Sequence, residues 1–269
     1  QKETGATFLH PFNDKYVIAG QGTIGLEILE QLDGKVDTIL CPIGGGGIIA
    51  GIAVAAKGIN PNIKIVGVQT ANIPSMQESM KNGEVTTAFK STTIADGIAV
   101  KTPGDVTFEI INELVDEVVV VEEDEIAQGM LFLMENQKVV AEGAGAVTTA
   151  ALLSGKYVPK KDENVVCVIS GGNVDVNTLY RVIGTALTKE ARRYSFNTVI
   201  QDKPGGLAEL TKIISEYDAN ILSANLSRSS MGGALGSLTA EMVLETFNHD
   251  HIDKLKVAIT EAGFEIVEI

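Results

Sequence analysis

The chain has 269 residues, of which 45% are hydrophobic and 21% are charged, and its formal net charge is −14. This balance is typical of a globular protein with a buried core and excludes an intrinsically disordered chain. The negative charge disfavours nucleic acid and anionic membranes as partners. The sequence has no run approaching the roughly 20 apolar residues of a membrane helix, and its polar first residues, Gln-Lys-Glu-Thr, do not resemble a secretory signal.

The first 190 residues alternate short β-branched runs with longer amphipathic runs. The predicted strands are residues 6–9, 38–41, 63–69, 117–121 and 165–169. The predicted helices are residues 23–32, 48–57, 75–82, 104–114, 123–137, 143–153 and 177–188. This order predicts an α/β domain over residues 1–190, with a parallel sheet covered by helices on both faces. Ligands of such sheets bind at the carboxyl ends of the strands, so functional residues are expected just after each strand.

A short basic segment, residues 191–195, is predicted to link this domain to a second one over residues 196–269. The predicted strands of the second domain are residues 196–201, 220–227, 237–246 and 264–269, and its helices are residues 207–217 and 251–262. A glycine-rich loop at residues 230–236 joins its second and third strands. The β-α-β-β-α-β order predicts a small ferredoxin-like fold.

The two cysteines, Cys41 and Cys167, both lie in apolar runs that are predicted to be strands. Two buried thiols favour a reducing compartment, here the cytoplasm, over a disulfide framework. The sequence offers no base beside either thiol, so neither is interpreted as a nucleophile.

Four consecutive glycines, Gly44, Gly45, Gly46 and Gly47, follow a predicted strand, and a helix is expected from Ile48 onward. Glycine lets backbone amides approach an anion without an intervening side chain, and a helix N-terminus carries a partial positive charge. The pattern therefore predicts a phosphate-binding loop. It matches neither a dinucleotide fingerprint nor a P-loop, because no Lys-Ser/Thr pair follows the glycines. The alternative is a tight strand-to-helix turn without a ligand.

The segment Ser-Gly-Gly-Asn at residues 170–173 occupies the same kind of position after another predicted strand. The hydroxyl of Ser170 could point into the ligand crevice there. It lacks the G-x-S-x-G context of a hydrolase nucleophile, and His10, His249 and His251 are all distant in sequence. A positioning hydrogen bond is therefore favoured over nucleophilic attack, with a purely structural turn as the alternative.

These two motifs are accompanied by Ile-Ala-Asp-Gly at residues 94–97 and Ala-Glu-Gly-Ala-Gly-Ala at residues 141–146. In this order and spacing the four motifs resemble those of threonine dehydratases, in the tryptophan-synthase-β-like class of pyridoxal-phosphate enzymes. The resemblance implies the parallel-sheet fold type II of that class. Residues 196–269 resemble the ACT regulatory domain that some dehydratases carry at their C-terminus.

The resemblance also implies how the cofactor, pyridoxal 5′-phosphate, is bound. Its phosphate would be held by the four glycines and the amide of Ile48, and its pyridine nitrogen by Ser170. Glu142 would be the family's acidic residue near the ring, or else a glutamate that stabilises a helix start. The full implied set is Gly44, Gly45, Gly46, Gly47, Ile48, Gly97, Glu142, Ser170 and Gly171. No cluster has the spacing of metal ligands. A neutral hydroxyl on the ring nitrogen favours prompt loss of a β-hydroxyl over reactions through a long-lived carbanion.

The implied activity is deamination of L-threonine to 2-oxobutanoate and ammonia, with L-serine giving pyruvate, in isoleucine biosynthesis or threonine catabolism. The alternatives are a serine racemase, another β-elimination enzyme, or a non-catalytic ligand-binding fragment. The family's cofactor lysine lies in a motif like Pro-Thr-Gly-Ser-Phe-Lys, and a second motif, Ser-x-Gly-Asn-His, surrounds the ring. Neither motif occurs in the sequence. The chain is therefore expected to be the C-terminal part of the enzyme, with no catalytic residue of its own, and to be inactive alone.

The ACT-like region is expected to bind an amino-acid effector and so to regulate the enzyme. Pairing of exposed sheet edges between chains would create the binding pocket, in a homodimer or homotetramer. The candidate effector-binding residues are Asp202, Gly206, Leu207, Asn220 and Ile221. A structural or dimerising appendage is the alternative.

Overall fold

The structure, a computed structural model, describes residues 4–228 and 236–268. The chain divides into two compact units, Gln1–Val182 and Ile183–Ile269. The boundary falls within α7 (Val176–Lys189), earlier than the predicted domain limit at residue 190. The predicted linker is also shorter than expected, because residues 193–195 already belong to a strand.

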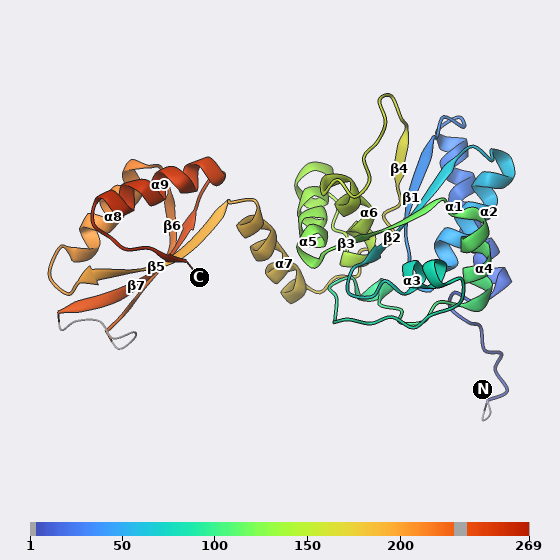
Figure 1. Cartoon of the computed structure of the whole chain (residues 1–269), viewed down its shortest axis with the longest axis horizontal. Helices are drawn as coiled ribbons and strands as arrows, with labels where there is room; N and C mark the ends of the chain where they lie inside the picture. Colours follow the sequence, from blue (N-terminus) through green and yellow to red (C-terminus); the bar gives the residue numbers. More distant parts are fainter. Residues whose placement is uncertain (1–3, 229–235, 269) are drawn as a thin grey trace. The chain divides into compact units, whose positions relative to one another are not determined.

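The first unit is built on a parallel sheet with the strand order β3-β2-β1-β4 (Figure 1). Its strands are β1 (Thr38–Pro42), β2 (Lys64–Thr70), β3 (Glu117–Val121) and β4 (Val165–Cys167). Every residue of the central strand β1 is buried. A parallel strand that is covered by helices on both faces reads as such an uninterrupted apolar run, which is why β1 was recognisable in the sequence.

Helices cover both faces of this sheet (Figure 1). α1 (Lys15–Gln31), α2 (Gly47–Ile59) and α4 (Asp105–Leu114) lie on one face, and α5 (Glu123–Phe132) and α6 (Gly143–Leu153) on the other. A short helix, α3 (Ser75–Asn82), a 3-10 turn at Asp96–Ile98 and a π turn at Leu133–Gln137 complete the unit. One hydrophobic core of this unit is built from β1, β2, α1, α2 and α4, with Ile39, Ile52 and Ile111 among its fully buried side chains.

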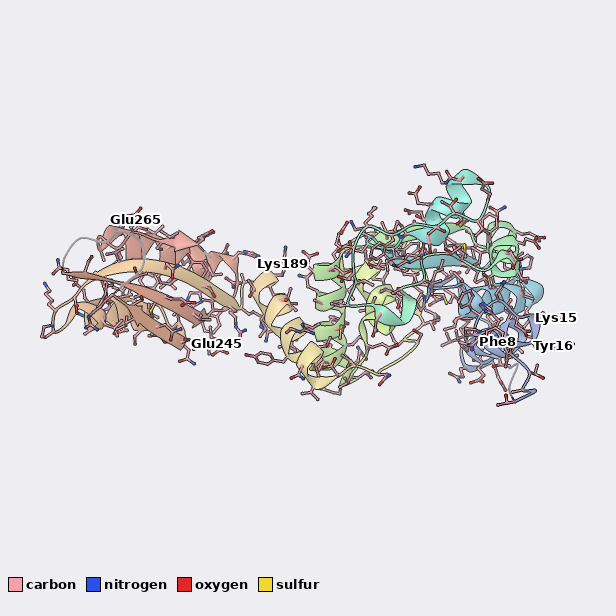
Figure 2. All side chains as sticks on the ribbon, turned by 90° about the horizontal axis from the view of Figure 1, so that it is seen from below. Phe8, Lys15, Tyr16, Lys189, Glu245 and Glu265 are labelled. Carbon is pink, nitrogen blue, oxygen red and sulfur yellow. The ribbon has the colours of Figure 1, made fainter. Side chains whose placement is uncertain are left out.

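The N-terminal segment departs from the prediction. Residues 6–9 form no strand, and Phe8 is 65% exposed (Figure 2), because no neighbouring strand supplies the hydrogen bonds that a strand needs. α1 begins eight residues earlier than predicted, because the side chain of Asp14 caps it by accepting hydrogen bonds from Tyr16 N at 2.8 Å and Val17 N at 3.2 Å.

Other predicted elements agree closely with the structure. The predicted bounds of α3, α6 and β3 are confirmed without change. The helix predicted at residues 123–137 instead ends as α5 at Phe132 and continues as the π turn, and β4 is two residues shorter than predicted. A π turn is a single-turn change of hydrogen bonding at the end of an α-helix, and apolar periodicity over a longer window does not locate it.

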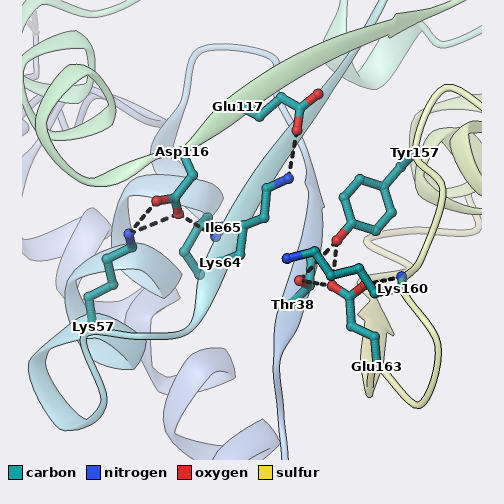
Figure 3. Close-up of polar contacts among 9 residues, drawn as sticks. All are labelled: Thr38, Lys57, Lys64, Ile65, Asp116, Glu117, Tyr157, Lys160 and Glu163. Carbon is teal, nitrogen blue, oxygen red and sulfur yellow. Dashed lines mark hydrogen bonds and ion pairs between the residues drawn. The ribbon is translucent and has the colours of Figure 1, made fainter.

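The amino-terminal edge of the sheet is held by a cluster of polar contacts (Figure 3). The carboxylate of Glu163 accepts hydrogen bonds from the hydroxyls of Thr38 and Tyr157 and from Lys160 N. These three donors lower the pKa of Glu163 to about 2. Nearby, Asp116 pairs with Lys57 Nζ at 2.8 Å and accepts from Ile65 N at 2.7 Å. This edge is therefore tied together by side chains, whereas the opposite edge carries the loops described below.

The second unit contains an antiparallel sheet of order β6-β7-β5-β8. Its elements are β5 (Arg193–Gln201), α8 (Gly206–Glu216), β6 (Asn220–Ser227), β7 (Ser237–Glu245), α9 (His249–Glu261) and β8 (Val267–Glu268). Alternate side chains of β5, including Phe196 and Ile200, are buried in one core with residues of α8 and α9. The β-α-β-β-α-β order and the bounds of β6 are confirmed, whereas β8 is shorter than predicted. The predicted glycine-rich loop lies outside the described residues except for Gly236.

Candidate functional site

A cavity of about 310 Å³ opens at the carboxyl edge of the parallel sheet, within the first unit. It is lined by the loop between β1 and α2, by the 3-10 turn, by the start of α6 and by the loop that follows β4. Parallel sheets bind ligands at this edge because the loops that follow the strands converge there.

The glycine loop, residues 44–47, contributes backbone amides without hydrogen-bond partners. The first helical bond of α2 runs from Ala50 N to Gly46 O at 3.0 Å, and no side chain caps the helix. In the described residues, the amides of residues 44–49 therefore have no acceptor, although Gly45, Gly46 and Gly47 are buried. An unpaired buried amide is costly. A group of such amides at a helix N-terminus therefore fits an anion.

The shape of the glycine loop is fixed by its neighbours. Thr107 Oγ1 donates to Gly45 O at 2.6 Å, which ties the loop to α4. Gly46 adopts a positive φ of 97°, and a Cβ there would lie 2.7 Å from Ile111 Cδ1. A Cβ on Gly45 would overlap the ring of Phe12. The loop is therefore closely packed by its neighbours, and larger residues at Gly45 or Gly46 would displace it.

Glu142 joins two walls of the cavity. It is the N-cap of α6, its backbone N donates to Gly171 O at 3.1 Å, and its Oε2 accepts from Asn173 N at 3.0 Å. Its carboxylate lies between Gly97 and Gly171, where a Cβ would come within 3.1 Å and 2.5 Å of Oε1. These contacts hold the loop after β4 so that Ser170 lines the cavity.

The structure brings most of the predicted cofactor-binding residues together. The glycine loop, Ile48, Gly97, Glu142 and Ser170 all line the cavity. Gly171 is not in the lining, but it contacts Glu142 behind it. Neither cysteine lines the cavity, and burial raises the pKa of Cys167 to about 11 and that of Cys41 further still. Both thiols therefore remain protonated.

Sequence reasoning missed several side chains that line the cavity, among them Phe12 and Gln21. Phe12 lies in the segment before α1, where His10 Nδ1 accepts hydrogen bonds from Phe12 N and Asn13 N. Gln21 lies on α1 and is half-buried. Both belong to residues 10–22, for which the sequence predicted no regular element. The available signal in the sequence was the polar side chain of Gln21 between two glycines, Gly20 and Gly22.

The predicted effector-binding residues have contacts of their own in the second unit. Asp202 accepts from Arg228 Nε at 2.8 Å, and Asn220 Nδ2 donates to Glu245 at 3.2 Å. Leu207 and Ile221 are half-buried against the core of the unit, and Gly206 is the first residue of α8. In residues 4–228 and 236–268, no three histidine, cysteine or acidic side chains gather as a metal site. None of the described helices is both long and apolar enough to cross a bilayer.

Comparison with known proteins gives consistent matches. Residues 1–171 match the family described as pyridoxal-phosphate dependent enzyme. The L-threonine ammonia-lyase of Thermotoga maritima is 48% identical over 266 residues, which is 99% of this chain and 66% of that protein. The L-threonine ammonia-lyase of Geobacter sulfurreducens is 45% identical, over 98% of this chain and 65% of that protein. The chain thus spans slightly less than two thirds of the length of these relatives.

Solved structures match as well. Maize serine racemase superposes with a TM-score of 0.63 at 39% identity, covering 71% of this chain and 59% of the racemase. The processed form of threonine deaminase isoform 2 from Solanum lycopersicum gives a TM-score of 0.64 at 37% identity, covering 69% of this chain and 54% of the deaminase. The family match includes the glycine loop and most of the residues around the cavity. The chain therefore belongs to the family of pyridoxal-phosphate dependent enzymes.

Proposed function

We propose that residues 1–269 form the cofactor-phosphate site and the terminal unit of an enzyme that deaminates L-threonine to 2-oxobutanoate and ammonia. L-Serine, giving pyruvate, is the proposed second substrate. The observation that carries the proposal is the group of buried, unpaired amides in the glycine loop, which fits the phosphate of pyridoxal phosphate. The two unpaired thiols support a reducing compartment, and we propose the cytoplasm.

Each of the predicted cofactor-binding residues has a proposed role in binding pyridoxal phosphate. The glycine loop and Ile48 hold the phosphate, and Ser170 hydrogen-bonds the pyridine nitrogen. Gly97 leaves room at the edge of the ring, while Glu142 and Gly171 fix the loop that carries Ser170. When bound, pyridoxal phosphate supplies an electron sink for the pair of electrons left when the α-proton of the amino acid is removed. The hydroxyl of Ser170 is neutral and so does not keep the pyridine nitrogen protonated. The ring then stores less negative charge, which favours prompt loss of the β-hydroxyl of the substrate.

The chemistry also requires a lysine that binds the cofactor covalently and takes the α-proton. No lysine lines the cavity among the described residues. We therefore propose the deamination for the polypeptide that supplies this lysine together with residues 1–269. The 269-residue chain by itself is expected to bind cofactor analogues and to release no 2-oxobutanoate.

A serine racemase is the nearest rival, because maize serine racemase has the same fold over 71% of this chain. The two ammonia-lyases, in contrast, match 99% and 98% of the chain, so their similarity continues through the second unit. Structural coverage does not separate the two activities, because the solved threonine deaminase covers 69% of this chain. The sequence similarity of the ammonia-lyases through the second unit is what favours the deaminase. Release of 2-oxobutanoate from L-threonine, without formation of D-serine from L-serine, is the expected result, and the reverse result would favour the racemase.

We propose that the second unit is an ACT-like domain that binds an amino-acid effector where two chains pair. The outer strands β6 and β8 leave unpaired backbone groups that a second chain could use, in a homodimer or homotetramer. Calorimetry of the chain with L-isoleucine and L-valine tests the proposal. Asp202→Ala should lower the affinity, whereas Asp250→Ala, on an exposed position of α9, should leave it unchanged. The absence of binding at millimolar concentration would leave the unit a structural appendage.

The cofactor site is tested with pyridoxine 5′-phosphate, which has no aldehyde and therefore reports non-covalent binding only. Wild-type chain should bind it, and Gly46→Asp should abolish binding through steric overlap with Ile111 and through repulsion of the phosphate. Gly58→Asp is the matched control, because Gly58 lies in the same helix with no atom within 4 Å of an added Cβ. Equal affinities of Gly46→Asp and wild type would contradict the proposed site.

A further inference from the structure

We propose that the side-chain amide of Gln21 donates a hydrogen bond to the cofactor phosphate, as the side-chain donor that completes the glycine loop. This inference rests on the proposed cofactor site. Gln21 lines the same cavity as the glycine loop and Ile48, and it comes from α1, a different element. Its side chain is half-buried, yet its amide has no hydrogen-bond partner among the described residues. A half-buried amide without a partner is available for a ligand.

Close packing of α1 on α2 carries Gln21 to the cavity. The two helices meet through glycine: a Cβ on Gly51 of α2 would lie 2.6 Å from Gly22 N and 3.0 Å from the carbonyl carbon of Gln21. Gly25, one turn further along α1, also approaches the backbone of α2, since a Cβ on it would lie 3.2 Å from Ile52 O. Backbone therefore lies against backbone, and residue 21 is held one turn from the N-terminus of α2, where the unpaired amides lie.

Over the part of the chain that the structure describes, the cavity lining has no cationic side chain to bind a phosphate, so a neutral side-chain donor would strengthen phosphate binding. A phosphate ester carries nearly two negative charges at neutral pH. Glu142 is the ionisable side chain of the lining, and no lysine or arginine of the described residues balances it. Phosphate would be stabilised by amides and by the α2 dipole alone. Gln21 and Ser170 are the side-chain donors of the lining, and Ser170 is proposed to bind the ring nitrogen.

The test compares a ligand that carries phosphate with one that does not. Affinities of the 269-residue chain for pyridoxine 5′-phosphate and for pyridoxine are measured by calorimetry, and the ³¹P resonance of the bound phosphate is recorded. Gln21→Ala should weaken binding of pyridoxine 5′-phosphate by about tenfold, the size expected for one hydrogen bond to a charged group. Gln21→Glu, of the same shape, should weaken it further through like-charge repulsion. Both variants should bind pyridoxine as wild type does, and Gln21→Ala should shift the ³¹P resonance.

Gln31→Ala is the matched control, because Gln31 is an exposed glutamine at the end of the same helix. It should leave all affinities unchanged. Two outcomes would overturn the inference alone: unchanged binding of pyridoxine 5′-phosphate by both Gln21 variants, or an equal loss of affinity for both ligands. Failure of the wild-type chain to bind pyridoxine 5′-phosphate would instead overturn the proposed cofactor site, and the inference with it.

Discussion

The contact between α1 and α2 predicts opposite effects for two glycine-to-alanine changes in one helix. Gly51 and Gly58 both lie in α2, where alanine is favoured over glycine by about 0.5–1 kcal/mol. An added Cβ at Gly58 meets nothing within 4 Å. At Gly51 it would lie 2.6 Å from Gly22 N and closer still to Ile18 O, where ordinary contact begins at 3.4 Å. Gly58→Ala should therefore stabilise the first unit, and Gly51→Ala should destabilise it.

The magnitude follows from what must move. Both atoms that Gly51→Ala would meet are backbone atoms of α1, so no side chain can rotate away, and α1 must shift by about 1 Å in a close-packed interior. Overpacking of this kind costs about 1–3 kcal/mol. After the gain in helix propensity, we expect Gly51→Ala to lower the free energy of unfolding by about 1–2 kcal/mol. Gly58→Ala should raise it by up to about 1 kcal/mol.

The assay must distinguish the two units of the chain, because a whole-chain signal would mix their unfolding transitions. Hydrogen–deuterium exchange in increasing urea, followed on peptides from α1 and α2, reports the first unit alone. The same peptides should lose protection earlier in Gly51→Ala and later in Gly58→Ala. Equal stabilisation by both changes would refute the backbone contact and, with it, the path that brings Gln21 to the cavity.

Three further predictions concern the polar contacts. The pKa of Glu163 is about 2, below its ordinary value of 4.5, so its carboxylate stabilises the fold fully above pH 4.5 and loses this contribution as the pH falls toward 2. Glu163→Gln should be less stable at pH 7. Its urea midpoint, measured by exchange on peptides of the first unit, should fall less between pH 5 and about pH 2 than that of wild type. Thr107→Val removes the hydrogen bond to Gly45 O, so calorimetry should show that pyridoxine 5′-phosphate binds more weakly by about 0.5–1.5 kcal/mol. Thr23→Val, on the exposed side of α1, is the control and should leave the affinity unchanged. Ser170→Ala should reduce affinity for pyridoxine 5′-phosphate and for pyridoxine alike, because the donor is proposed to bind the ring; a loss confined to the phosphorylated ligand would contradict that role.

The elements that sequence predicts best are those whose signal is local. β1 and β3 are continuous apolar runs, and α6 is a run of small residues behind a glutamate, so each has a distinctive composition over its whole length. The strand predicted at residues 6–9 has the right composition as well, but a strand also needs a partner, and a single sequence window contains no information about partners. The early start of α1 depends on the cap at Asp14, a signal that the prediction of a helix from residue 23 did not include.

The residues of the site also divide into those that sequence motifs predict and those that only the structure identifies. The glycine loop and the Ser-Gly-Gly-Asn segment follow predicted strands directly, so their convergence at one edge of a parallel sheet follows from the order of elements. Phe12 and Gln21 enter the cavity only because α1 and the segment before it pack against α2 and α4. That packing is determined by glycines far apart in the chain, and no motif marks it. Residues that reach a site through such contacts require the structure to identify them.

The packing around the glycine loop also explains why all four of its residues are glycines, although only one of them has a backbone conformation that favours glycine. Only Gly46 of the four adopts a positive φ, so backbone freedom accounts for a single position. Gly45 is required because the ring of Phe12 occupies the space of its Cβ. Gly44 and Gly47 are required because a Cβ there would lie 3.0 Å from Ile98 Cα and 3.1 Å from Phe12 Cα, respectively. The loop is thus compressed between α4, the 3-10 turn and the segment before α1, and its amides have no acceptor among the residues that the structure describes. A loop held this way keeps its backbone fixed before any ligand arrives, and preorganised donors lose little entropy when an anion binds.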